Sequence, residues 1–182
     1  MEKLKKFILD YDIDITSLSE VNKDWRKVPY DNTIWGATAG WAEHRRVQVS
    51  HNKSISPGDS EYQVGGTAML MLGDINFRIS AQGEDSRKMG RWSFTTVTGK
   101  NNVTTTIFTC YCPCRSSSIG SAYVQQLLYM ATHKDNLPDI DCPRQLFGYD
   151  LKIELESKQE LGHNILVLGD FNSQYDTLCT WM

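Results

Sequence analysis

The sequence predicts a layered α/β or α+β domain. Three observations lead to this expectation: the middle of the chain is rich in strand-forming residues, helical periodicity occurs near the start and again after residue 120, and residues 165–168 form a short apolar run. The chain has 182 residues, of which 40% are hydrophobic. This size suits one compact core, so we expect residues 1–182 to form a single domain.

The first third is predicted to contain a helix, a strand and then long loops. The spacing of one apolar helix face is shared by Leu4, Phe7, Ile8 and Tyr11. Residues 13–18 are rich in β-branched side chains and predict a strand that ends beside Glu20. Residues 23–63 have little periodicity and many Trp, Gly, Asn, Ser and Pro residues, so we expect loops with one or two short strands there.

Two pairs of strands are predicted in the middle of the chain. Residues 67–72 and 75–80 flank Gly73-Asp74, a dipeptide typical of a two-residue hairpin turn. Residues 92–97 and 103–111 are threonine-rich and are joined across a Gly-Lys-Asn-Asn segment, which predicts a second pair.

Helices return in the last third. Ser121 is a suitable N-cap for a helix whose expected apolar face comprises Tyr123, Val124, Leu127, Leu128 and Ala131. A second helix is expected from Pro143 to a stop at Gly162. The apolar run at 165–168 then predicts a strand buried on both faces.

Composition restricts the class of protein. The formal net charge is −3, so no overall positive field favours non-specific binding to nucleic acid. The five cysteines are an odd number and no signal segment precedes them, so we expect reduced thiols and an intracellular location, cytoplasmic or nuclear. No run approaches the roughly 18 apolar residues that span a bilayer, and we expect a monomer without a membrane partner.

Two polar residues follow the apolar run at 165–168. Asp170 and Asn172 alternate along the chain, so both side chains can converge on one side of the strand end. A carboxylate beside an amide can handle a proton and hold a phosphate oxygen. The alternative is an ordinary turn in which both side chains satisfy local backbone groups.

Glu20 and Tyr111 stand at the ends of two other predicted strands. Mg²⁺ prefers oxygen ligands, retains water and typically takes one or two protein carboxylates, which suits Glu20 as a metal ligand. The alternative for Glu20 is a solvated surface charge. The phenol of Tyr111 can bond a phosphate oxygen, or its ring can simply belong to the core.

Taken in their order along the chain, the motifs around Glu20, Tyr111 and Asp170 resemble those of the endonuclease/exonuclease/phosphatase superfamily. This is a deoxyribonuclease-like group of Mg²⁺-dependent phosphodiesterases. The resemblance is closest to the endonuclease domain associated with reverse transcriptases of mobile elements. Its main motifs are Leu18-Ser19-Glu20, Tyr111-Cys112-Pro113 and Gly169-Asp170-Phe171-Asn172. Further similarity lies in Gly65-Gly66-Thr67, Gly90-Arg91-Trp92, Gln125-Gln126 and Asp150-Leu151.

The resemblance implies a four-layered sandwich of two mixed β-sheets flanked by helices, with endonuclease activity on DNA rather than RNA. Glu20 would bind Mg²⁺, with Mn²⁺ as a substitute. Tyr111 would contact the scissile phosphate, Asp170 would orient the attacking water or handle its proton, and Asn172 would stabilise the transition state. Phosphoinositide phosphatases and sphingomyelinases resemble the same core, so the substrate stays open.

The sequence departs from the family pattern at both ends. It has no counterpart of the family's initial strand with a catalytic Asn, or of its terminal Asp and Ser-Asp-His segments. None of its four histidines matches the catalytic position. We therefore expect a partial, truncated domain with exposed sheet edges. One alternative is a catalytically inactive remnant or fragment. Another is a nucleic-acid-binding module that uses Trp25, Trp35 and Trp41 with Arg45-Arg46 or Arg87-Lys88 and Arg91.

Overall fold

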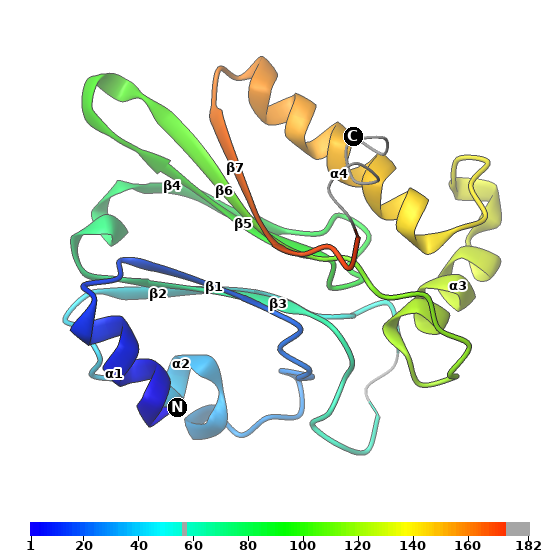
Figure 1. Cartoon of the computed structure of the whole chain (residues 1–182), viewed down its shortest axis with the longest axis horizontal. Coiled ribbons are helices and arrows are strands. Elements are labelled where there is room, and N and C mark those ends of the chain that lie inside the picture. Colours follow the sequence, from blue (N-terminus) through cyan, green and yellow to red (C-terminus); the bar gives the residue numbers. More distant parts are fainter. Residues whose placement is uncertain (56–57, 174–182) are drawn as a thin grey trace.

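The computed structural model describes residues 1–55 and 58–173. Two β-sheets pack face to face, and helices lie on the outer face of each sheet (Figure 1). The expected α+β class with two sheets is therefore confirmed.

The first sheet has three antiparallel strands in the order β1-β3-β2. They are β1 (Ile15–Ser19), β3 (Thr67–Leu72) and β2 (Arg45–Ser50). All six residues of β3 are buried, since this central strand is covered on both faces. Helices α1 (Glu2–Asp10) and α2 (Ile34–Ala37) lie on the outer face (Figure 1), and α2 follows the 3-10 helix η1 (Tyr30–Asn32).

The second sheet has four strands in the order β4-β5-β6-β7. They are β4 (Ile79–Glu84), β5 (Trp92–Thr98), β6 (Thr104–Tyr111) and β7 (Asn164–Asp170). The first three are antiparallel, with η3 (Lys100–Asn102) between β5 and β6, while β6 and β7 are parallel.

The connection from β6 to β7 contains α3 (Ala122–Thr132), η4 (Lys134–Asn136) and α4 (Pro143–Glu160). Helix α4 covers the outer face of the four-stranded sheet (Figure 1), where its Phe147 and Leu151 pack in one core cluster with Trp92 and Phe108. Pro143 occupies the first turn of α4, where a missing N–H costs no helical hydrogen bond.

Both predicted helix starts in the last third are confirmed, but the predicted apolar face of α3 is wrong. The Ser121 hydroxyl accepts a hydrogen bond from the Val124 N–H at 3.3 Å and caps α3. The buried residues of α3 are Ala122, Gln126 and Met130. Met130 packs with Met89 and Leu146, so this flank of the helix is turned towards α4, and Leu128 is 57% exposed.

The hairpin predicted across Gly73-Asp74 is also wrong. Strand β3 ends at Leu72, and a 3-10 helix, η2 (Gly73–Arg78), carries the chain into the other sheet, where β4 begins. The buried Asn76 amide holds this passage by donating to the carbonyls of His44, Met71 and Gly73. One side chain thus replaces the backbone bonds that a hairpin would supply.

Strand β7 was predicted to be buried on both faces, and this is wrong for one face. Ile165 and Val167 pack beneath α4, but Leu166 and Leu168 are 45% and 40% exposed. Within the described residues, β7 pairs only with β6. It is therefore an edge strand, and its other face is incompletely covered.

The described cysteines, Cys110, Cys112, Cys114 and Cys142, are free thiols, as expected for these four. Burial raises the pKa of Cys112 to about 12, so this thiol is protonated at neutral pH. Among the helices in the described ranges, none has the length and apolarity needed to cross a membrane.

Candidate active site

The ends of β1 and β6 are fastened together across the two sheets. The Ser19 hydroxyl, at the last position of β1, donates to the Cys110 carbonyl at 2.9 Å. Glu20, which follows Ser19, and Tyr111, which follows Cys110, therefore come close to each other. The Tyr111 hydroxyl donates to Glu20 Oε1 at 3.3 Å, although the two residues are far apart in the sequence.

Strand β7 brings Asp170 to the same place. In the parallel ladder of β6 and β7, Tyr111 is the register partner of Asp170, and the Cys112 N–H donates to the Asp170 carbonyl at 2.9 Å. Gly169 permits this contact, because a Cβ there would lie 2.1 Å from the Cys110 carbonyl oxygen, and its φ is +145°. The glycine of Gly-Asp-Phe-Asn is thus required by the close approach of β6.

Asn172 is folded back onto the end of β6. Its backbone N–H donates to Asp170 Oδ1 at 3.0 Å, and its side-chain amide donates to the Cys112 carbonyl at 3.0 Å. The turn interpretation is therefore correct for Asp170 Oδ1 and for the Asn172 side-chain nitrogen, which both bond to local backbone groups. No described residue donates a hydrogen bond to Asp170 Oδ2 or Asn172 Oδ1, which leaves one oxygen of each side chain for another partner.

The segment after β1 is held by an interaction that sequence reasoning missed. Glu20 and Asn22 have φ values of +56° and +53°, which are uncommon for residues other than glycine. The Asn22 side-chain oxygen accepts from the Gly65 N–H at 2.8 Å, and the Asn22 N–H donates to the Gly65 carbonyl at 2.8 Å. Gly65 lies against the Tyr111 ring, where an added Cβ would be 3.0 Å from Cε1.

Arg144 is a second residue that the sequence analysis did not single out. Its buried guanidinium donates to the carbonyls of Pro113, Phe171 and Asn172 at 2.7, 3.2 and 2.9 Å. It therefore ties the Tyr-x-Pro segment to the Gly-Asp-Phe-Asn segment. The sequence offers one signal for Arg144, which is its place in the first turn of α4. The helix dipole is unfavourable to a positive charge there, so an arginine at this position suggests that nearby oxygen atoms accept its hydrogen bonds.

The protonation of Tyr111 follows from its surroundings. Burial raises the pKa of the Tyr111 phenol well above its ordinary value, and the nearby carboxylates of Glu20 and Asp170 raise it further. The phenol therefore keeps its proton at neutral pH and acts as a hydrogen-bond donor. Glu20 is exposed and Asp170 is partly exposed, so solvent can reach both carboxylates near this donor.

The oxygen donors at this point are compatible with a magnesium ion. Within the described ranges, no three side chains of the His, Cys, Asp and Glu types converge as a metal site. Mg²⁺ does not need such a cage, because one or two carboxylates with water and substrate phosphate suffice. No described residue donates a hydrogen bond to Glu20 Oε2, and this carboxylate oxygen suits such an ion.

Other residues considered from the sequence lie elsewhere. Arg91 is fully buried and pairs with Asp85 and Asp150, and Arg87 also pairs with Asp150. Arg91 therefore cannot reach nucleic acid at the surface, and Arg87, whose side chain is 20% exposed, is paired with Asp150. Trp25, Trp35 and Trp41 belong to the cluster between the three-stranded sheet and its helices, so core packing explains them.

The histidines also have other neighbours. His51 is buried near Asp24, His44 packs against Phe77, His133 stacks on Tyr129 and His163 contacts Thr106. In the described part of the chain, no hydrogen bond, ion pair or ring contact links any of them to Glu20, Tyr111, Asp170 or Asn172.

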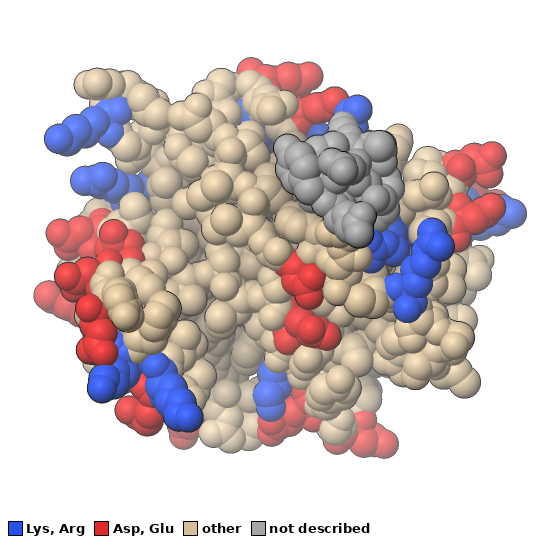
Figure 2. Space-filling view, viewed as in Figure 1, with Lys and Arg blue, Asp and Glu red and all other residues tan. Residues whose placement is uncertain are grey.

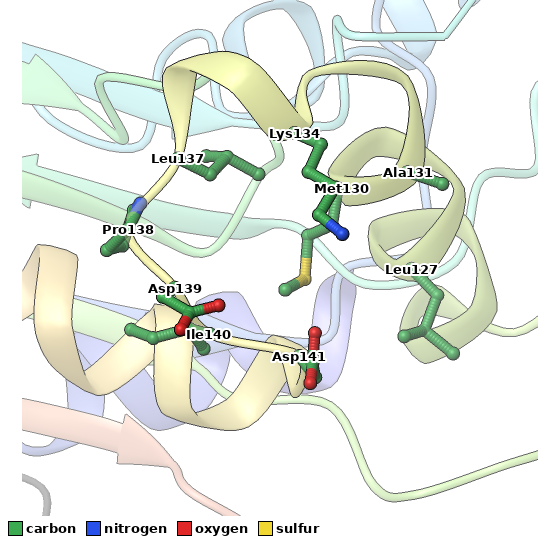
Figure 3. Close-up of a pocket in the computed structure, with 9 residues that line it drawn as sticks. All are labelled: Leu127, Met130, Ala131, Lys134, Leu137, Pro138, Asp139, Ile140 and Asp141. Carbon is green, nitrogen blue, oxygen red and sulfur yellow. The ribbon is translucent and has the colours of Figure 1, made fainter.

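The cavity beside α3 does not coincide with the candidate site. A cavity of about 470 Å³ lies between α3 and the segment before α4. Figure 3 shows Met130 and Leu137 directed into it, and none of the four motif residues lines it. On the face shown in Figure 2, basic side chains are scattered and interspersed with acidic ones. The candidate site is defined by hydrogen bonding and by strand register.

A comparison with known protein families finds no match, and no curated protein is significantly similar to the chain. The similarity to phosphodiesterases is therefore a resemblance of short motifs.

Proposed function

We propose that this chain is a metal-dependent phosphodiesterase domain, specifically an endonuclease that cleaves DNA with Mg²⁺, or with Mn²⁺ in its place. The observation that carries the proposal is the convergence at Tyr111, whose hydroxyl contacts Glu20 and whose backbone is in register with Asp170. Residues from three strand ends thus offer two carboxylates, a protonated phenol and an amide within one small region.

Each of these groups has a role in this proposal. Glu20 would hold the ion, which supplies positive charge to a phosphate oxygen when bound. Tyr111 would transfer its hydrogen bond from Glu20 to a phosphate oxygen of the substrate. Asp170 would accept a proton from the attacking water, and Asn172 would stabilise the transition state by donating the second N–H of its side-chain amide to a phosphate oxygen.

Cleavage assays test the proposal directly. We expect supercoiled plasmid DNA to be nicked with Mg²⁺ and to stay intact with a chelator. Asp170→Asn should lower the rate by about 100-fold or more, as is usual for the loss of an acid–base group. Glu20→Gln should also lower it strongly, because it removes the charged ligand of the ion. Asp139→Asn, a change of an exposed carboxylate outside the site, is the matched control.

The substrate class is tested by running RNA, inositol phosphates and sphingomyelin beside the plasmid. Metal-dependent cleavage of one of these in preference to DNA would keep the phosphodiesterase proposal and replace its substrate. The absence of metal-dependent cleavage on every substrate would contradict the proposed activity.

A second candidate is nucleic-acid binding without cleavage. It is favoured by the positions of the described histidines, none of which contacts the motif residues, so an imidazole acid is not provided there. This candidate predicts DNA binding that weakens strongly as salt rises from about 50 to 200 mM, because phosphate contacts release counterions. Fluorescence anisotropy with labelled DNA measures it, and binding that does not respond to salt would count against it.

A further inference from the structure

The segment that joins α3 to α4 folds around the cavity of about 470 Å³. All of its lining residues lie between Leu127 on α3 and Asp141, which precedes the N-cap of α4. The cavity is therefore formed by one continuous stretch of chain, and its walls do not depend on residues outside the described ranges. Its volume falls within the range of about 300–1,000 Å³ that is typical of sites for small molecules.

One wall of the cavity is apolar and fixed to the core. Met130 is buried, and Leu137 and Ile140 pack against the core cluster that contains Met130 and Met89. Figure 3 shows the sulfur-bearing end of Met130 directed into the cavity. A thioether in this position favours an aromatic ligand, because contacts between sulfur and an aromatic ring are stabilising.

Charged side chains of both signs line the rest of the cavity. They are Lys134, Asp139 and Asp141. In Figure 3 the Lys134 side chain comes from η4, whereas the two carboxylates stand on the segment that leads to α4. Among the described residues, none of these three side chains forms an ion pair or a hydrogen bond. All three charges are therefore available to a ligand.

This combination of groups restricts the class of ligand. A hydrocarbon would leave all three charges unused, a simple cation would meet the lysine, and a simple anion would meet two carboxylates. A zwitterion places an opposite charge against each group. An aromatic body then covers the apolar wall and contacts the Met130 sulfur.

We propose that the cavity between α3 and α4 binds a small zwitterion with an aromatic body, which is the chemical class of an aromatic amino acid. Lys134 holds the carboxylate of the ligand, Asp139 and Asp141 hold its ammonium group, and its ring lies against Met130 and Leu137. None of the four motif residues of the candidate active site lines the cavity. The proposal therefore stands independently of the phosphodiesterase activity.

Isothermal titration calorimetry of the complete chain with L-phenylalanine tests the proposal. We expect saturable binding of one ligand per chain, with a dissociation constant on the order of 1 mM or lower, as suits so small a ligand. Two analogues each remove one charge, since phenylalaninamide lacks the carboxylate and 3-phenylpropionate lacks the ammonium group. Each should bind about three- to fivefold more weakly than phenylalanine, because solvent-exposed ion pairs contribute modestly.

Charge variants assign the two ends of the ligand. Lys134→Gln should weaken the binding of phenylalanine about three- to fivefold and leave that of phenylalaninamide unchanged. The double variant Asp139→Asn/Asp141→Asn should weaken the binding of phenylalanine but not that of 3-phenylpropionate. The controls are Lys152→Gln and Asp135→Asn, which change exposed charges that do not line the cavity.

Met130→Leu tests the aromatic preference, because it keeps an apolar side chain of similar volume and removes the sulfur. It should weaken the binding of phenylalanine about twofold or more and leave the weaker binding of L-leucine unchanged. Circular dichroism checks the fold of each variant. If Met130→Leu does not fold, Lys134→Gln, at an exposed position, decides the matter.

Three outcomes would overturn the proposal. The first is the absence of saturable binding at millimolar phenylalanine, and the second is a Lys134→Gln protein that binds phenylalanine as tightly as the unsubstituted chain. The third is equal affinity for phenylalanine and phenylalaninamide, which would point to the N-terminus of a peptide in place of a free amino acid.

Discussion

At the scale of single residues, Tyr111 connects the candidate site. Its ring rests on Gly65, its hydroxyl contacts Glu20, and its strand position faces Asp170. A variant that keeps the ring and removes the hydroxyl separates the role of Tyr111 in the proposed reaction from its role in packing, because only the hydroxyl contacts a carboxylate.

We expect Tyr111→Phe to lower the rate of DNA cleavage by about 100-fold, since a donor to the phosphate is removed. The ring is retained, so the free energy of unfolding should fall by only about 1 kcal/mol, the usual contribution of one hydrogen bond. Tyr149→Phe, a change on the surface of α4, serves as control. An active Tyr111→Phe enzyme would remove Tyr111 from the mechanism.

The close approach of Gly169 to β6 leads to a prediction about stability. In Gly169→Ala the new Cβ would meet the Cys110 backbone, and the residue would keep a φ that favours glycine. We expect a loss of about 2–4 kcal/mol in the free energy of unfolding, measured by urea denaturation. Gly120→Ala, at an open position without a positive φ, should change it by less than about 1 kcal/mol. Equal stabilities of the two variants would show that β6 and β7 do not approach so closely.

The residue types of the candidate site could be predicted from the sequence, but their supports could not. Glu20, Tyr111, Asp170 and Asn172 each stand at or beside a strand end, which a short motif reveals. The contribution of Asn22 depends on its contact with Gly65, and that of Arg144 depends on three distant carbonyls. Such contacts arise only when the sheets pack, so no local pattern encodes them.

At the scale of elements, strands and helices with strong periodicity were predicted well. The β5 and β6 pair and helix α4 occur where the sequence places them. One error concerns conformation, since residues 75–78 were predicted to be strand and belong to the 3-10 helix η2. The other errors concern which neighbours cover a face. An apolar run such as 165–168 predicts a strand, but the covering of its faces depends on elements that come from elsewhere in the chain.

Helix α4 is joined to the four-stranded sheet by buried charges as well as by apolar contacts. Asp150 on α4 accepts from Arg87 and Arg91, and Arg91 also pairs with Asp85. Arg91 is fully buried, so an unpaired charge at this point would be costly. Its attraction holds the pKa of Asp85 below the ordinary value, although burial alone would raise it.

We expect Asp150→Asn to lower the free energy of unfolding by about 3 kcal/mol, because it leaves two cations with one carboxylate. Glu154→Gln on the same helix removes only a partly exposed pair with Lys158, and should change it by about 0.3–0.5 kcal/mol. Urea denaturation of both variants compares the two sites. A small effect of Asp150→Asn would mean that the helix depends on its apolar contacts alone.

At the scale of the whole molecule, His51 makes stability depend on pH. Burial lowers its pKa from 6.5 to about 4, and neither ring nitrogen has a hydrogen-bond partner among the described residues. The charged groups around it are Asp24, Arg26, Lys53 and Glu84. Between pH 6.5 and 4 the unfolded chain binds a proton at this histidine and the folded chain does not, so acid favours unfolding.

We expect the free energy of unfolding to fall by about 2 kcal/mol between pH 7 and pH 5 on account of His51, from the shift of its pKa. His51→Gln should flatten this slope, and the exposed His133→Gln should leave it unchanged. Urea denaturation at several pH values measures the slopes. An unchanged slope in His51→Gln would show that other groups cause the pH dependence.

The parallel pairing of β6 with β7 has a consequence for the order of folding. Tyr111 and Asp170 become neighbours only after the whole crossover with α3 and α4 has been closed into a loop, and loop closure costs entropy before any contact repays it. The antiparallel ladder of β5 and β6 closes across a short turn and can form early. In pulse-labelled refolding, amide protons of β5 should therefore gain protection before those of β7, and the candidate site should be among the last parts of the protein to assemble.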